Sequence, residues 1–564
     1  MMKKKLLSCL LVFLSAGLQS AAADFETATS AVSNMGLGWN LGNTLDAHSG
    51  KAMADVVQSE TYWGQPVTRP ELMQMMKQAG FGAIRVPVTW YPHMAADGTV
   101  DAAWMKRVHE VVDYVISQGL YCILNVHHDT GADSDSHTSW LKADMATYNA
   151  QKARYEGLWR QIATEFRDYG ERLLFESYNE MLDTYSSWCF ASFATSAKYN
   201  ATVATSAYNA INSYAQSFVD VVRATGGNNA QRNLVVNTYG ACSGAGTWNS
   251  HLQDPLKQMK LPTDKVQGHL AFQIHAYPDI ANLSSAKAEM DGMFTALQTH
   301  LVAKGAPVII GEWGTSDSNA DYTSNRANML SFADYFVKKA KAAGMAPFYW
   351  MGLTDGMARS LPAFSQPDLA ETLVKACHGS GYQGTFPTED DFDVTYTVSY
   401  SGQWQELNLS STALNVSDYS GLRVELQQAP PKDYLQVKLY GSTKEGYLPV
   451  SGASTAVSFS TAYGTSLSRI TLQYCKTASY EAVVRQVVLI KKDGTELIVR
   501  PTVFWGCSLS VDARPKTSGI RSVSVGRGTD DGRVYNLAGQ PVTTLRRGVY
   551  VRGGRKYVVT GTAR

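Results

Sequence analysis

Eight short apolar segments, separated by longer amphipathic ones, recur through the first two thirds of this chain and limit the folds open to it. They lie at residues 35–41, 82–88, 120–127, 172–180, 233–239, 269–275, 307–312 and 347–351. Between most of them, apolar residues recur every three or four positions, as is typical of helices at 69–78, 102–118, 149–166, 207–223 and 325–343. Eight strand and helix repeats predict an α/β fold, the (β/α)₈ TIM barrel.

A doubly wound open sheet is the alternative arrangement for repeats of this kind. Such a sheet carries a glycine-rich phosphate turn after its first strand. The corresponding segment here, GLGWNLGN at residues 36–43, lacks the third glycine at the spacing of a dinucleotide site. The closed barrel is therefore the favoured prediction.

The chain is also too long for a single ordinary core, and its pattern changes after the eighth repeat. Residues 379–391 (GSGYQGTFPTEDD) read as a linker after a barrel domain at 24–378. Short alternating runs then predict an all-β, sandwich-like domain at 392–511. Residues 515–564 hold two or three short strands around turns, which makes a β-rich tail too small for a robust domain.

The N-terminus and the charge balance indicate the compartment and the kind of partner. Three lysines, an apolar run at residues 6–18 and the alanines at 21–23 predict a signal peptide over residues 1–23 and export of the protein. Lys and Arg number 50 and Asp and Glu 49, so no general attraction to nucleic acid or to a membrane surface is expected. No later run of about 20 apolar residues predicts a membrane span.

The cysteines carry little chemistry. Beyond the signal segment there are six, with no C-x-x-C pair, which disfavours a thiolate zinc site. Cys475 and Cys507 lie in one later segment, where they either pair after export or serve as isolated small apolar residues.

Polar and aromatic residues gather where the predicted strands end, which is the face on which barrels carry chemistry. In chain order the candidates are Asn40, Arg85, His127, His128, Asn179, Glu180, His275, Tyr277, Glu312 and Trp350. Trp63 and Trp90, near predicted loops, are further candidates for stacking on a sugar ring.

Glu180 and Glu312 stand at the ends of the fourth and seventh predicted strands, where they can face one another. Paired carboxylates suit glycoside hydrolysis, in which one acid protonates the leaving oxygen and the other attacks the sugar or activates water. The alternative is a pair of ion-paired rim residues. Glu176 shares strand parity with Glu180 and is interpreted as a structural partner of Arg85.

A metal site is the other interpretation of the polar strand ends. His127, His128 and Asp129 are consecutive, but zinc catalysis needs three converging ligands, and no H-x-H or H-E-x-x-H motif accompanies them. We therefore expect no metal and no other cofactor.

The motifs resemble those of glycoside hydrolase family 5, the cellulase-type (β/α)₈ enzymes. They are GWNLGNTLDA (38–47), ETYWGQP (60–66), IRVPVTW (84–90), LNVHHD (124–129), FESYNE (175–180), HAYPD (275–279), GEWG (311–314) and FYWMG (348–352). The first two, together with residues 222–236, are most similar to the subfamily-4 endoglucanases and xyloglucanases. Met181 departs from the proline that many relatives have after the acid.

The resemblance implies a role for each matching residue. Glu180 would be the general acid/base and Glu312 the nucleophile of a retaining enzyme. Arg85 and Tyr277 would stabilise the charged form of Glu312, while an apolar enclosure and the negative Glu312 would raise the pKa of Glu180.

The remaining candidates would bind or orient the substrate. Asn179 would donate to the sugar 2-hydroxyl. His127 and His275 would orient the acid and the substrate, and Trp350 would offer a ring face. His128 would either pack within its loop or contact the substrate, and the sequence does not decide between these two roles.

The later segments allow several interpretations. The sandwich is either a carbohydrate-binding module or a spacer or stabilising domain, and the aromatic residues that allow the first interpretation are Trp404, Tyr434, Tyr440, Tyr447 and Trp505. The tail, with YNLAGQPV and GVYVRGGRKYVV, resembles the sorting tails of type IX secretion cargo in the Bacteroidetes group. That resemblance implies a secreted or cell-surface enzyme.

The combined prediction is a secreted, monomeric, retaining endo-β-1,4-glucanase that hydrolyses β-glucan polysaccharides. A xyloglucanase or β-mannanase of the same family remains open, because specificity lies in the strand-end loops. A non-catalytic polysaccharide-binding surface protein is the alternative of another class.

Overall fold

The computed structural model describes residues 24–131, 139–187, 199–246, 250–315, 325–410 and 413–516, with three strands beyond them at 535–536, 548–552 and 555–559. The chain divides into two compact units, Met1–Asp390 and Asp391–Arg564. The predicted signal peptide lies outside the described residues. None of the described helices combines the length and the apolar character that crossing a membrane requires.

The first unit is a closed parallel barrel in which each strand pairs with the next in chain order, and β8 pairs with β1. This confirms the predicted (β/α)₈ fold. The strands are β1 (Gly38–Asn40), β2 (Ala83–Val86), β3 (Tyr121–Asn125), β4 (Leu173–Glu176), β5 (Leu234–Asn237), β6 (Leu270–Ala276), β7 (Val308–Trp313) and β8 (Ala346–Tyr349).

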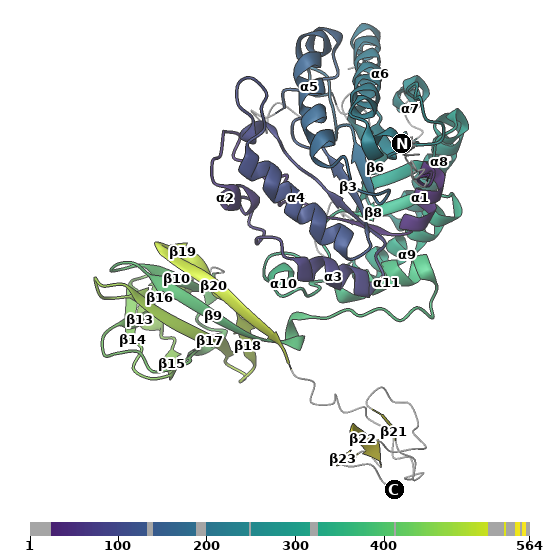
Figure 1. Ribbon diagram of the computed structural model, residues 1–564. Coiled ribbons are helices and arrows are strands. Elements are labelled where there is room, and N and C mark those ends of the chain that lie inside the picture. Colours follow the sequence, from purple (N-terminus) through teal and green to yellow (C-terminus); the bar gives the residue numbers. More distant parts are fainter. Residues whose placement is uncertain are drawn as a thin grey trace, which may run out of the picture. The chain divides into compact units, whose positions relative to one another are not determined.

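Helices surround these strands, as Figure 1 shows. They are α1 (Ala28–Met35), α2 (Val56–Glu60), α3 (Pro70–Ala79), α4 (Ala102–Ser117), α5 (Met145–Glu165), α6 (Ala201–Ala224), α7 (Asp254–Gln258), α8 (Leu283–His300), α9 (Arg326–Ala342), α10 (Met357–Ser360) and α11 (Pro367–His378).

Local sequence explains where the long helices begin. The Asp101 side chain accepts a hydrogen bond from the Trp104 backbone N–H at the start of α4, and Asp144 does the same for Thr147 in α5. Such caps satisfy backbone donors that have no partner within the helix. The apolar stripe of α4, Val108 to Val115, is buried against the barrel.

The barrel interior has an apolar lower layer and a polar upper layer. Below, α1 closes the end of the barrel through Ala28, Val32 and Met35, which cluster with inward residues such as Ile123 and Leu174. The predicted strand segment 35–41 had included Met35, but Met35 is the last residue of α1, and the first strand begins at Gly38. Nearer the carboxyl ends, the buried inward residues are Asn40, Arg85, Asn125, Glu176, Asn237 and Gln273.

In the second unit, residues 392–515 form two antiparallel sheets. One has the order β14-β13-β16-β10-β19, with β11 paired to β16, and the other the order β15-β12-β17-β9-β20, with β18 paired to β17. The Tyr400 hydroxyl of one sheet donates to the Leu472 carbonyl of the other at 3.0 Å, so the sheets pack face to face. Cys475 and Cys507 are unpaired thiols, in agreement with their interpretation as small filler residues.

The strands of this unit are β9 (Phe392–Tyr400), β10 (Glu406–Ser410), β11 (Leu414–Asn415), β12 (Tyr419–Leu426), β13 (Leu435–Gly441), β14 (Glu445–Pro449), β15 (Ser454–Ser458), β16 (Ser466–Tyr474), β17 (Tyr480–Lys491), β18 (Glu496–Val499), β19 (Thr502–Trp505) and β20 (Cys507–Pro515). In the tail, β21 (Tyr535–Asn536), β22 (Gly548–Arg552) and β23 (Arg555–Val559) form a small antiparallel sheet.

Candidate active site

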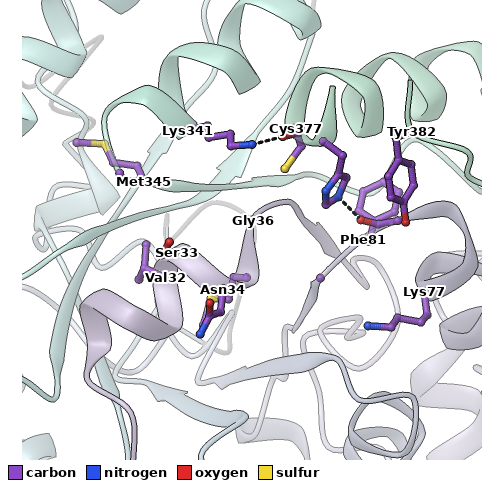
Figure 2. Close-up of a pocket in the computed structure, with 15 residues that line it drawn as sticks. Val32, Ser33, Asn34, Gly36, Lys77, Phe81, Lys341, Met345, Cys377 and Tyr382 are labelled. Atoms are coloured by element: carbon purple, nitrogen blue, oxygen red, sulfur yellow. Dashed lines mark hydrogen bonds between the residues drawn. The ribbon is translucent and has the colours of Figure 1, made fainter. Parts of the chain in front are cut away.

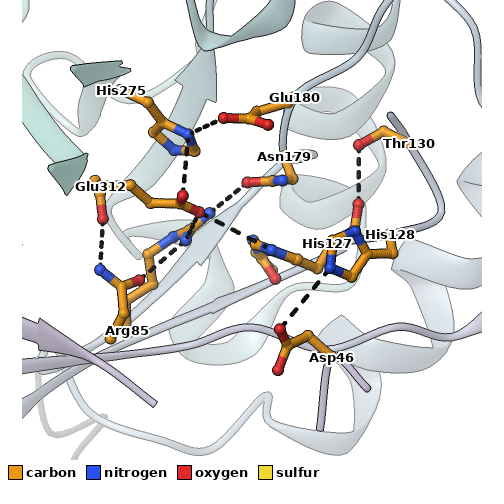
Figure 3. A network of polar contacts seen from close by, with 12 residues as sticks. Asp46, Arg85, His127, His128, Thr130, Asn179, Glu180, His275 and Glu312 are labelled. Carbon is orange, nitrogen blue, oxygen red and sulfur yellow. Dashed lines mark hydrogen bonds and ion pairs between the residues drawn. The ribbon is translucent and has the colours of Figure 1, made fainter. Parts of the chain in front are cut away.

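The candidate site lies at the carboxyl ends of the barrel strands, above the polar inner layer. Figure 3 shows the side chains that converge there from β2, β6 and β7 and from the loops after β3 and β4. Of the predicted site residues, Arg85, Asn179, Glu180, His275, Tyr277 and Glu312 are joined by direct contacts.

Arg85 is the centre of the network and is fully buried. Its Nη1 donates to Glu312 Oε1 at 2.6 Å, while Nε and Nη2 form a two-pronged ion pair with Glu176 at 2.7 and 2.8 Å. Nη1 also donates to the Asn40 Oδ1 atom at 3.0 Å, and Nη2 to Asn179 Oδ1 at 2.8 Å. Burial by itself would lower the pKa of Arg85, but the two carboxylates have the larger effect and raise the pKa above its usual value.

A β-bulge aims Glu312 into this network. The register of β7 shifts against both β6 and β8 between Ile310 and the end of the strand. Gly311 lies against the inward side chain of Gln273, where a Cβ atom would approach it to 2.2 Å. Trp313 packs outward on Phe336 of α9, with ring centroids 4.3 Å apart. Two consecutive residues, 311 and 312, thus face the interior, as a bulge allows.

Glu312 has several partners that favour its charged form. Tyr277 donates its hydroxyl to Oε2 at 2.8 Å, and Arg85 contacts Oε1. The pKa of the Glu312 carboxyl is raised overall, because burial and the charge of Glu180 outweigh the opposing effects of the Arg85 charge and the Tyr277 hydrogen bond.

Glu180 has a different environment. His275 Nδ1 lies 2.7 Å from its Oε1 atom, and 22% of the Glu180 side chain stays exposed. Burial raises its pKa to about 7, opposed only by the more distant charge of Arg85. An oxygen of Glu180 and an oxygen of Glu312 lie within 4.8 Å of each other. The two acids are therefore close together but differently held.

Two histidines and an asparagine orient groups around the acids. Burial lowers the pKa of His275 to about 4 and that of His127 well below its usual value, so both rings are neutral near pH 7. His127 Nδ1 lies 3.1 Å from the Asn125 amide nitrogen, which directs its Nε2 toward Glu312, 3.9 Å away. Because Arg85 binds the Asn179 oxygen, the Asn179 amide N–H groups point away from the arginine.

An aromatic wall flanks the acids. The Trp350 ring is parallel to the His127 ring at 5.8 Å, and the Trp63 ring lies 5.2 Å from His128 and 5.0 Å from His48. Trp63 is 36% exposed, and part of the His128 side chain is exposed too, so these side chains are available to a ligand.

Two of the predicted substrate-binding residues have other positions. Trp90 has no exposed surface, and its indole N–H donates to the Asn125 carbonyl at 2.9 Å. The structure does not support the prediction that Trp90 stacks on substrate, because the whole ring is buried in the apolar core. Asn40 is fully buried as well, and it supports Arg85 and the Gly311 carbonyl instead of touching the cleft.

Sequence reasoning missed several residues of the site. Asn237 and Gln273 complete the buried polar layer, and Asp46 and His48 support the aromatic wall. Strand parity is the signal that could have found the first two, since Asn237 is the last residue of β5 and Gln273 has an inward position in the middle of β6. Asp46 and His48 lie in a loop, where no periodicity marks them.

Among the residues that the structure describes, two groups of side chains each bring three possible metal ligands together. One group is Asp46, His127 and His128, and the other is Glu180, His275 and Glu312. The Asp46 carboxylate already accepts the backbone N–H groups of Asn43 and Thr44 at 3.1 and 2.8 Å. In the second group, Arg85 and Tyr277 each occupy an oxygen of Glu312. Hydrogen bonds within the protein account for both groups.

A pocket of about 440 Å³ lies at the opposite end of the barrel (Figure 2). It is lined by residues that precede the strands, including Gly36, Gly82 and Met345, and by His378, which contacts the Gly80 carbonyl at 2.8 Å. Its lining contains no carboxylate. Barrel enzymes carry their chemistry at the other face, so this pocket is not the active site.

A barrel whose mouth holds two adjacent carboxylic acids, one beside arginine and tyrosine and one with a pKa of about 7, defines the class of two-carboxylate glycoside hydrolases. Comparison with known proteins agrees with this class. The profile of the family described as Cellulase (glycosyl hydrolase family 5) matches residues 46–354. The chain belongs to glycosyl hydrolase family 5 and is a glycoside hydrolase of the cellulase type.

Individual relatives extend the comparison. Endoglucanase A of Paenibacillus barcinonensis is 33% identical over 368 residues, which cover 59% of this chain and 84% of that protein. A GH5-4 broad specificity endoglucanase from an uncultured bacterium is 61% identical, with a TM-score of 0.61 over 63% of this chain and 96% of the other. A family 5 enzyme of Prevotella bryantii B14, solved with a xyloglucan tetradecasaccharide, is 42% identical, with a TM-score of 0.57 over 63% and 99% of the two chains.

Proposed function

We propose that the barrel unit is a retaining endo-β-1,4-glucanase that cuts internal bonds of β-glucans by double displacement. The observation that carries this is the short separation of the two acids, whose nearest oxygens lie within 4.8 Å. Retaining glycosidases hold their carboxyl groups about 5–5.5 Å apart, whereas inverting ones need about 6.5–9.5 Å to admit a water molecule.

In the first step, Glu180 donates its proton to the glycosidic oxygen while Glu312 attacks the anomeric carbon. The contacts support this division of roles, because Arg85 and Tyr277 hold the Glu312 carboxylate and burial keeps Glu180 protonated up to about pH 7. The bond between the sugar and the leaving oxygen breaks, and a covalent glycosyl–Glu312 ester forms.

In the second step, Glu180 removes a proton from water, which attacks the ester and releases Glu312. Formation of the ester has removed the negative charge of Glu312, and this lowers the pKa of Glu180 and prepares it to act as a base. The Asn179 amide is positioned to donate to the sugar 2-hydroxyl, a contact that strengthens in the transition state. Trp350 and Trp63 offer ring faces to the sugars.

The substrate range that we propose is broad and includes xyloglucan. A relative that is 61% identical is described as a broad specificity endoglucanase, and another was solved with a xyloglucan oligosaccharide. Carboxymethyl cellulose, xyloglucan, lichenan and glucomannan should be compared at equal concentration by release of reducing ends. Activity on the first three supports the proposal, and release from glucomannan alone would favour a mannanase. No release from any of them would favour the non-catalytic alternative.

We further propose that the enzyme acts as an exported monomer. The acids, Arg85, Tyr277 and the aromatic wall all come from one chain, so the site is complete without a partner. The N-terminal signal pattern and the tail that resembles type IX sorting segments support export. Deleting residues 515–564 should leave the protein inside the cells of a host with that secretion system, and secretion of the truncated chain would contradict the sorting role.

A further inference from the structure

One face of the second unit carries aromatic and polar side chains in place of apolar ones. It is the outward side of the sheet β14-β13-β16-β10-β19, and we call it the ring face. Along β13, Val437 and Leu439 point into the sandwich and are fully buried, whereas the alternating Lys438 and Tyr440 point to the ring face. The paired positions on neighbouring strands share this orientation.

Four aromatic rings extend across this face. Tyr447 pairs with Lys438 on the β14 edge, and Trp505 pairs with Glu406 on the β19 edge. Between them, the Tyr440 and Phe504 rings have centroids 6.3 Å apart. Tyr447 is 51% exposed, Phe504 40% and Trp505 57%. Because the sheet has four strand spacings of about 4.8 Å, the ring face extends about 19 Å from β14 to β19, which is long enough for several sugar residues.

A buried polar network holds the rings in place. Glu406 is 5% exposed, and its Oε2 atom accepts hydrogen bonds from the Tyr440 hydroxyl and the Thr471 hydroxyl, both at 2.7 Å. Its Oε1 atom accepts from Gln473 Nε2 at 2.7 Å. The Arg469 guanidinium carbon lies 3.8 Å from the centre of the Phe504 ring. These contacts preorganise the surface, which lowers the entropic cost of binding a ligand.

The charges on the ring face balance. Lys438 and Arg469 are cationic, Glu406 and Glu445 are anionic, and Lys438 lies 3.6 and 3.4 Å from those two carboxylates. A surface of this kind does not select an acidic or a basic polymer. Flat rings interleaved with amides and charged groups instead suit a pyranose, which has apolar C–H faces and a rim of hydroxyl groups.

We propose that the ring face binds a neutral β-glucan chain, so that the second unit is a carbohydrate-binding module. The inference rests on the proposed function, because it takes as its ligand the polymer that the barrel unit hydrolyses. The chain would run across the strands from Tyr447 to Trp505, with sugar rings stacked on the aromatic side chains and hydroxyl groups bonded to the polar ones between them.

The test uses the full chain carrying Glu312→Gln and Trp350→Ala, which remove hydrolysis and weaken binding in the barrel cleft. Association with amorphous cellulose is measured by depletion from solution. In this background, Tyr447→Ala combined with Trp505→Ala should weaken association about tenfold, and each single change should give an intermediate loss. Both side chains are at least half exposed, so the fold should be retained, as thermal unfolding would verify.

The matched control is Ile498→Ala, which removes a side chain that is 63% exposed on β18 of the other sheet and should not change association. The inference is overturned if the background protein does not associate with cellulose, or if the double variant associates as well as its parent. Hydrolysis of soluble glucan by the unmodified chain is measured in parallel. Its absence would refute the proposed function, whereas loss of the difference between the variants would refute only the module.

Discussion

The ends of β4 and β7 carry the same chemical group in different surroundings. Glu312, on β7, is held by Arg85 and Tyr277 at 2.6 and 2.8 Å. Glu180, beyond β4, contacts neutral His275 and has a pKa raised to about 7 by burial. In the mechanism that we propose, neighbouring side chains, and not the acids themselves, divide the roles of nucleophile and proton donor.

The largest expected effect comes from removing the acid at β7. Glu312→Ala should lower kcat on carboxymethyl cellulose at least ~10³-fold, because no other group can form the covalent ester. Initial rates of reducing-end release measure this. Glu371→Ala on α11, a half-exposed carboxylate paired with Lys375, is the control and should be neutral. A loss below about tenfold at Glu312 would contradict its role.

The raised pKa of Glu180, in the loop after β4, leads us to predict how activity depends on pH. Glu180 must be protonated in the first step, and the protonated form is present below its pKa of about 7 and is lost above it. The ratio kcat/KM should therefore fall about tenfold per pH unit above neutrality, or about 100-fold by pH 9. A profile on soluble xyloglucan that stays flat to pH 9 would show that Glu180 is not the titrating acid.

A milder change acts on the surroundings of Glu312 alone. Tyr277→Phe removes the hydroxyl that donates to Oε2 and should lower kcat about tenfold. Since that hydrogen bond favours the charged form, its loss should raise the pKa of Glu312 and move the acid limb of the pH profile upward. An unchanged acid limb would mean that Tyr277 does not tune the nucleophile.

The smallest effect is expected at Trp63, the part of the aromatic wall whose ring contacts are with His48 and His128 and not with the two acids. Trp63→Ala removes a ring that is 36% exposed near His128 and His48. We expect KM for xyloglucan to rise about three- to fivefold with kcat little changed, because the ring contributes to binding in ground and transition states alike. A fall in kcat larger than the rise in KM would place Trp63 in the catalytic step.

The fold and the positions of the two acids could be predicted from the sequence. Periodicity alone predicted the barrel, and apolar runs that end in acids located Glu180 and Glu312. The resemblance to family 5 then assigned their roles. Parity also indicated that Glu176 points inward, where it pairs with Arg85.

The parts that could not be predicted depend on departures from regular patterns. Strict alternation in β7 would turn Glu312 outward, since Ile309 and Gly311 both face the interior, and only the bulge returns it to the site. The burial of Trp90 depends on packing between distant segments. Likewise, helix α1 ends at Met35, which is the first residue of an apolar segment that by itself resembles a strand.

The most direct test of the division between Glu180 and Glu312 is chemical rescue of the two alanine variants by azide, using an activated aryl β-cellobioside. Azide is small enough to enter the space left by Glu180→Ala, and there it should attack the covalent ester on Glu312. The predicted result is a β-glycosyl azide, identified by the anomeric proton coupling in NMR spectra, from Glu180→Ala and not from Glu312→Ala. A β-glycosyl azide from Glu312→Ala, or no azide product from Glu180→Ala, would contradict the account.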